Sequence, residues 1–88
     1  MSNPTQNEIR AAQAESLLNN PAFKEALQIV RQAYIERMIS TTHEDADGRD
    51  HMHKCILALQ DLQATLTAFV TSGTIDKVTR EKKAKFQG

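Results

Sequence analysis

The sequence has little of most features that identify a class of protein. Its 88 residues include one cysteine, two prolines, three glycines and no tryptophan, and aromatic residues make up 5%. The single cysteine, Cys55, excludes a disulfide framework within the chain. Eleven Lys and Arg balance eleven Asp and Glu, so the formal net charge is zero. That balance argues against a surface built as a whole for nucleic acid, and the length limits the chain to one small domain.

Long apolar runs are also missing. No stretch approaches the roughly 20 apolar residues that a transmembrane helix needs. Residues 1–10 are polar and lack the apolar segment of a secretory signal. We therefore expect a protein without membrane contact that stays in the cytoplasm of the cell in which it is made.

The few prolines and asparagines coincide with expected helix starts. Asn3-Pro4 predicts a first helix over 4–19, with Asn3 as N-cap and Gln6 placed for a capping box. Asn20-Pro21 predicts a second helix over 21–40, in which apolar residues recur every three or four positions.

A third helix is predicted over 44–72. Thr42 and Asp45 read as a capping box before it, and Gly73 reads as the left-handed residue that follows its last turn. Its apolar residues alternate by three and four, as in a helix-pairing seam, and are Met52, Cys55, Leu59, Leu62, Leu66 and Phe69. Residues 74–88 then form a short basic C-terminal tail.

These elements predict an all-α fold. A short break between two long amphipathic helices makes them an antiparallel hairpin, on which the N-terminal helix packs. The expected organisation is a helical domain over 1–73 and the basic tail over 74–88.

The hairpin leaves apolar side chains that it cannot cover alone. The second helix carries a second apolar stripe, and the third helix is longer than its partner, so its last turns overhang. Either the N-terminal helix or a second subunit covers these residues, and we expect a homo-oligomer. The predicted self-association residues are Ile29, Ile35, Ile39, Leu66, Phe69 and Val70.

Candidate chemistry is sparse. Asp47, His51 and Cys55 are spaced four apart on one helix face, as zinc ligands can be, but no further Cys or His-rich segment completes the site, and Cys55 also fits the apolar seam. No catalytic residues, metal or cofactor site can be named. A short helical hairpin also offers little concave volume for a substrate, so we expect a protein that is not an enzyme.

The tail has two interpretations. Five basic residues outnumber two acidic ones there, and clustered Lys and Arg can contact phosphates with release of counterions. The alternative is a solvated terminus or a segment that docks on a protein. The candidate phosphate-contact residues are Lys77, Arg80, Lys82, Lys83 and Lys85.

Three segments of the chain, AESLLNNPAFKEAL at 14–27, HEDADGRD at 43–50 and ALQDLQATLTAFVTSG at 58–73, resemble short helical proteins of tailed bacteriophages. Those proteins are encoded among the head and packaging genes. The resemblance covers about two thirds of the chain and rests on spacing and helix ends. It implies a bacteriophage protein that is not an enzyme, located in the cytoplasm of the bacterial host or in the virion.

Three functions follow as hypotheses. The first is self-association and docking on a larger phage or host protein during head assembly or DNA packaging. The second is a phage-encoded inhibitor that binds a host enzyme or defence protein. The third is a weak nucleic-acid-binding module that acts through the basic tail.

Overall fold

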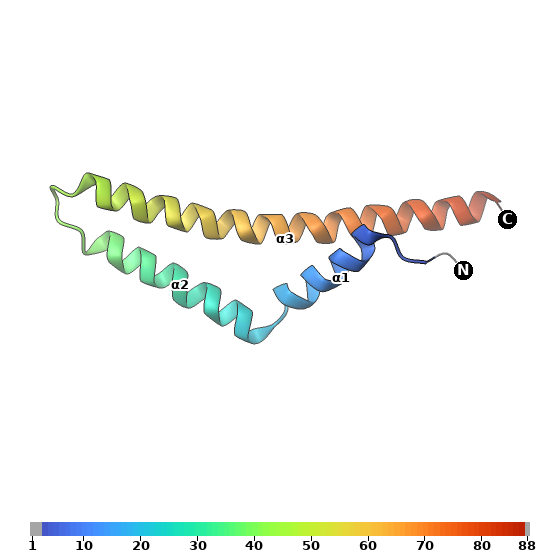
Figure 1. The fold of residues 1–88 in the computed structure, drawn as a ribbon, viewed down its shortest axis with the longest axis horizontal. Helices are drawn as coiled ribbons and strands as arrows, with labels where there is room; N and C mark the ends of the chain where they lie inside the picture. Colours follow the sequence, from blue (N-terminus) through green and yellow to red (C-terminus); the bar gives the residue numbers. More distant parts are fainter. Residues whose placement is uncertain (1–2, 88) are drawn as a thin grey trace. The chain divides into compact units, whose positions relative to one another are not determined.

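The structure, a computed structural model, describes the backbone of residues 3–87 and the side chains of residues 3–85. It contains three helices, α1 (Gln6–Leu18), α2 (Pro21–Ile39) and α3 (Ala46–Gln87), and no strand within residues 3–87 (Figure 1). The all-α class predicted from apolar periodicity is confirmed. The ends of the two expected regions, at residues 1–2 and 88, lie outside the described residues.

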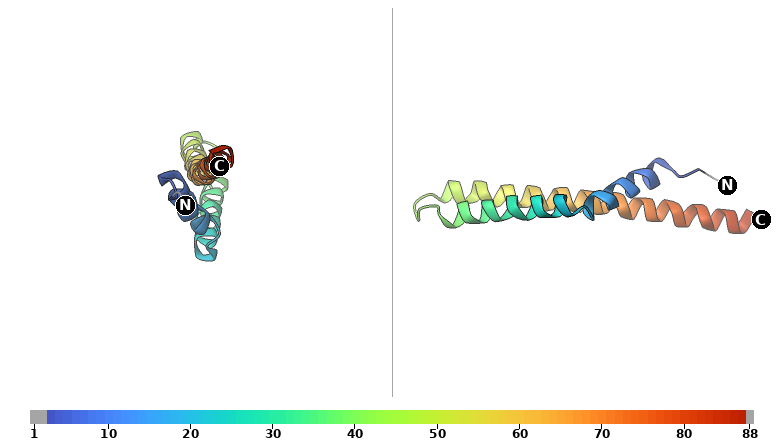
Figure 2. Two further views of the ribbon diagram at one scale, coloured as in Figure 1. Left: turned by 90° about the vertical axis from the view of Figure 1, so that its right-hand side faces the viewer. Right: turned by 90° about the horizontal axis from the view of Figure 1, so that it is seen from below.

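The chain divides into two compact units, each with its own helix pair. The α1 unit contains the described parts of Met1–Asn19 and Ala64–Gly88, so it joins α1 to the second half of α3. The α2 unit is Asn20–Gln63 and joins α2 to the first half of α3. Both units share α3, which is one continuous helix (Figure 1 and the right-hand view of Figure 2).

The start of α1 differs from the predicted one. Thr5, and not Asn3, is the N-cap, because the Glu8 backbone N–H donates to Thr5 Oγ1 at 3.1 Å. The Thr5 backbone N–H donates in turn to Glu8 Oε2 at 2.7 Å, which completes a capping box. Pro4 therefore precedes the cap, and α1 begins two residues later than expected.

The start of α2 agrees with the prediction, whereas that of α3 is shifted. Asn20 Oδ1 accepts from the Phe23 backbone N–H at 3.0 Å, and Pro21 opens α2. At α3 the Asp45 carboxylate accepts from the Gly48 backbone N–H at 2.9 Å. Asp45 thus caps a helix that starts at Ala46, and the box expected between Thr42 and Asp45 is replaced by this single cap.

The end predicted for the third helix at residue 72 is wrong. α3 continues through Gly73 to Gln87, and no glycine among residues 3–87 has a positive φ. Gly73 is buried in the α1 unit. A glycine just after an apolar seam is typical of a helix end, but this one lies inside the helix, where its missing side chain leaves space for α1. Residues 74–87, expected as a tail, are therefore helical.

Burial is slight in both units. No residue between 20 and 63 is buried. In the α1 unit the buried apolar side chains of the described residues are two alanines, Ala11 at 8% exposure and Ala14 at 4%. Large apolar side chains of the described region are at best half-buried, so neither helix pair has the core of an independent globular domain.

Replacing Gly73 by alanine is expected to loosen α1. Alanine favours a helix interior over glycine by about 1 kcal/mol. However, a Cβ at position 73 would overlap the Ala11 Cβ and lie 2.9 Å from the Asn7 carbonyl oxygen. Overpacking of this kind costs about 1–3 kcal/mol, so the overlap outweighs the gain. Hydrogen exchange should show faster exchange of α1 amides in Gly73→Ala.

The control for this prediction is Thr79→Ala, at an exposed position of the same helix. It raises helix propensity without meeting α1, so exchange in α1 should stay as it is or slow down. Equal or slower exchange in Gly73→Ala would contradict a close contact at residue 73.

Candidate interaction surfaces

The α1 unit is built around a close contact between two helices. Gly73 of α3 faces Ala11 of α1, and the space for a side chain at position 73 is taken by Ala11, Asn7 and Glu8. Small residues at such a crossing let two backbones approach closely. The neighbouring side chains of α1 are thereby brought within reach of the last turns of α3.

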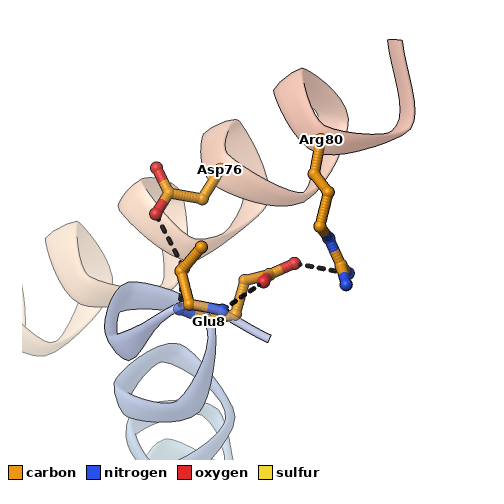
Figure 3. A network of polar contacts seen from close by, with 4 residues as sticks. Glu8, Asp76 and Arg80 are labelled. Atoms are coloured by element: carbon orange, nitrogen blue, oxygen red, sulfur yellow. Dashed lines mark hydrogen bonds and ion pairs between the residues drawn. The ribbon is translucent and has the colours of Figure 1, made fainter. Parts of the chain in front are cut away.

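Polar side chains hold the same two helices together (Figure 3). Thr5 Oγ1 donates to Asp76 Oδ2 at 2.7 Å, and Arg80 Nη2 donates to Glu8 Oε1 at 2.8 Å. The Glu8 side chain is 9% exposed and that of Arg80 is 29% exposed, so this ion pair is largely shielded from water. A hydrogen-bonded ion pair in such a setting is stronger than one on an open surface.

Half of the predicted self-association residues lie against α1. Leu66 and Phe69 line a hollow of about 170 Å³ together with Ala14 and Leu17 of α1. The Arg10 guanidinium lies over the Phe69 ring, 4.0 Å from its centroid. Val70 lines a second hollow of the α1 unit, beside Gly73. All three residues are half-buried. The sequence did not decide whether the N-terminal helix or a second subunit covers them, and in the structure α1 lies against them.

The other three predicted self-association residues belong to α2. Ile29 is 60% exposed and Ile39 is 75% exposed, whereas Ile35 is half-buried. At about 100° per residue the three positions fall within an arc of about 120°, so they share one side of the helix. Ile29 and Ile39 are therefore the exposed members of the predicted second stripe, and self-association through it stays a prediction.

A hollow of about 350 Å³ lies within the α2 unit. Two of its lining residues, Arg31 and Gln63, are joined by a hydrogen bond of 3.0 Å from Arg31 Nη2 to Gln63 Oε1. The rest of the lining is Lys24, Leu27 and Gln28. A mainly polar hollow of this kind is easily hydrated and does not resemble an apolar ligand pocket.

The five candidate phosphate-contact residues are part of α3. Arg80 is bound to Glu8, while Lys77, Lys82, Lys83 and Lys85 are exposed. Helical rotation of about 100° per residue distributes these side chains around the axis, so they do not form one basic face. Removal of residues 74–88 would also remove Asp76 and Arg80, two contacts of α1, and is not the neutral truncation that a separate tail would allow.

The candidate zinc ligands do not come together as a set. The His51 Nε2 and Cys55 Sγ atoms are 3.9 Å apart, one turn from each other. Among the residues that the structure describes, no three His, Cys, Asp or Glu side chains are grouped as a metal ion would require. Asp47 lies in the first turn of α3, where a carboxylate is favoured by the helix dipole.

Sequence reasoning missed the residues that hold α1. Thr5 and Asp76 are 71 positions apart, and Glu8 and Arg80 are 72 apart, so no local pattern connects them. A signal was present for Glu8, since Thr5 and Glu8 have the spacing of a capping box. This spacing is typical of a helix that starts after Thr5, but it does not show that the Glu8 carboxylate also binds Arg80 of α3.

Comparison with models of protein families, with curated proteins and with solved structures finds no match to this chain. Within the described part of the chain, no helix combines the length and the apolar character that crossing a membrane requires.

Glu8→Gln is expected to release α1 part of the time. Glutamine can still complete the capping box with Thr5, but the ion pair with Arg80 is lost, which should cost about 1–2 kcal/mol. Trypsin cleaves after Arg10 only when α1 opens locally, so cleavage at this bond should be about tenfold faster.

Glu15→Gln is the matched control, because Glu15 is exposed on the same helix. It removes the same charge from α1 without touching Arg80, and cleavage after Arg10 should be unchanged. Equal effects of the two variants would show that helix charge, and not the ion pair, retains α1.

Proposed function

We propose that the chain is a non-enzymatic interaction protein that self-associates and docks on a larger protein. One observation carries this proposal: the large apolar side chains of the described residues are not buried within either unit. Ile29, Ile39 and Ile75 expose 60%, 75% and 60% of their surface. Nine large apolar residues of the described region are exposed in all, and exposed apolar surface of this extent is typical of a chain that binds a partner.

Because little apolar surface is buried within the chain, association with a partner would stabilise the folded state. Burial of apolar surface contributes roughly 25 cal/mol per Å², and a small helical chain has few other sources of stability. In this proposal α2 and the first half of α3 act as an antiparallel hairpin, and the larger protein on which the chain docks covers its outer side chains. Association then adds the apolar burial that each chain lacks alone.

The setting that we propose is head assembly or DNA packaging of a tailed bacteriophage. The support for it is the sequence resemblance of residues 14–73 to short helical proteins encoded among such genes. An inhibitor of a host enzyme or defence protein would use the same exposed side chains. A phage that lacks the gene separates the two: empty or malformed heads in a permissive host indicate assembly, and normal particles with a host-restricted defect indicate inhibition.

Self-association is tested by gel filtration with light scattering, from micromolar to hundreds of micromolar protein. The expected result is a rise toward twice the monomer mass that persists at high salt, because apolar contacts are strengthened by excluded salts while ion pairs are screened. A monomer at every concentration would contradict the proposal. Dissociation by salt alone would show that charge, and not apolar surface, holds the copies together.

A further inference from the structure

An exposed stripe of side chains follows the second half of α3, away from the residues that contact α1. Its members alternate by four and three positions, as the contact residues of a coiled coil do. Each of them is exposed, although α1 is docked on the same stretch of α3. We call this stripe the α3 seam, and its residues are Ala64, Ala68, Thr71, Ile75, Val78 and Lys82.

The middle of the α3 seam is suited to burial. Ile75 is 60% exposed and Val78 is 43% exposed, so both have apolar surface to cover. Thr71 is the one hydroxyl-bearing residue of the seam, and its Oγ1 donates to the Thr67 carbonyl oxygen at 3.2 Å. A partner can therefore cover Thr71 without leaving its donor unsatisfied, and the Thr71 methyl group remains available for packing.

We propose that the α3 seam binds the α3 seam of a second copy of this chain, antiparallel and with the two-fold axis level with Gly73. This inference rests on the self-association proposed above and names its surface. In this register Thr71 faces Ile75 of the partner copy, and Ala68 faces the partner's Val78. A small residue then meets a larger one in each central layer, which lets the helices approach closely.

Charge along α3 favours the antiparallel orientation. Five Lys and Arg and one Glu occupy residues 77–85. A parallel pair would place this segment against its own copy, with Lys82 on the seam beside a second Lys82, and like charges at this spacing repel. In the antiparallel register the segment is level with residues 61–69 of the partner, which contain Asp61 and no Lys or Arg.

The ends of the seam fit the same arrangement. Lys82 is level with the partner's Ala64, so its aliphatic stem can cover the alanine while the ammonium group reaches water. A shift by one heptad would place Val78 opposite the Asp61 carboxylate and would pair Ala68 with Thr71, leaving small residues together. The register centred on Gly73 avoids both features.

Two matched variants test the surface. Ile75→Glu places a charge in the α3 seam, and Ile29→Glu places one on α2, at an isoleucine with the same 60% exposure. The dimer dissociation constant, from light scattering and sedimentation, should rise at least about tenfold in Ile75→Glu and stay unchanged in Ile29→Glu. Circular dichroism checks that both chains stay helical, and Ile75→Thr replaces Ile75→Glu if it does not.

The outcomes separate this inference from the proposed function. If the parent chain dimerises and Ile75→Glu has no effect, or Ile29→Glu breaks the dimer, the α3 seam is wrong while self-association holds. If the parent chain is monomeric at every concentration, self-association fails and the inference fails with it.

Disulfide formation tests orientation and register in a Cys55→Ala background. A mixture of Ala68→Cys and Val78→Cys chains should give a cross-linked heterodimer, because these positions meet across the axis. Ala68→Cys alone should stay unlinked, since two copies of residue 68 would be about 15 Å apart along the helices. Self-linking of each single variant without heterodimer would indicate a parallel pair and overturn the proposal.

Discussion

The contact between Gly73 and Ala11 is the constraint on which the α1 unit depends. A Cβ at position 73 would overlap the Ala11 Cβ, so a single added methyl group does not fit between the two helices. This approach brings Thr5 to Asp76 and Glu8 to Arg80, and it places Arg10 over Phe69. The Glu8–Arg80 pair beside this crossing is largely shielded from water, which strengthens its charged hydrogen bond.

The α2 unit has clear helix starts but no close packing of the kind seen at Gly73. Its helix starts are well specified, with Asn20 and Asp45 as caps, yet no residue between 20 and 63 is buried. Capping and propensity determine where a helix begins, but tertiary stability comes mainly from buried apolar area. The α2 unit thus has clear helices and no buried residue, and in the function proposed above a partner would supply the burial that it lacks.

The sequence predicted the elements better than their contacts. Asn20-Pro21 marked the start of α2 because the cap and the proline act locally, within one turn. Gly73 misled the reasoning because one residue type serves two needs: a left-handed turn after a helix and a close approach inside one. The two roles can be distinguished only when the residue that faces position 73 is known. That residue is Ala11, which is 62 positions away in the sequence.

At the candidate surfaces the sequence predicted some of the apolar residues that need cover, but not the face of α3 that continues beyond Gly73. Leu66, Phe69 and Val70 were identified as apolar residues that need cover, and the structure shows that α1 lies beside them. The exposed Ile75 and Val78 were not assigned to a seam, because ending the helix at Gly73 interrupts the heptad spacing that runs from Ala64 to Lys82. A single mistaken helix end thus concealed an entire face of α3.

The distance in sequence between α1 and its contacts also sets an order of events during synthesis. α1 leaves the ribosome first, but Asp76 and Arg80 are translated about seventy residues later. The hydrogen bond between Arg31 and Gln63 spans only 32 residues, so closing the α2 unit costs less chain entropy than closing the α1 unit. A nascent chain thus carries α1 without its binding site, and Leu66 and Phe69 emerge before the ion pair that retains α1 over them can close.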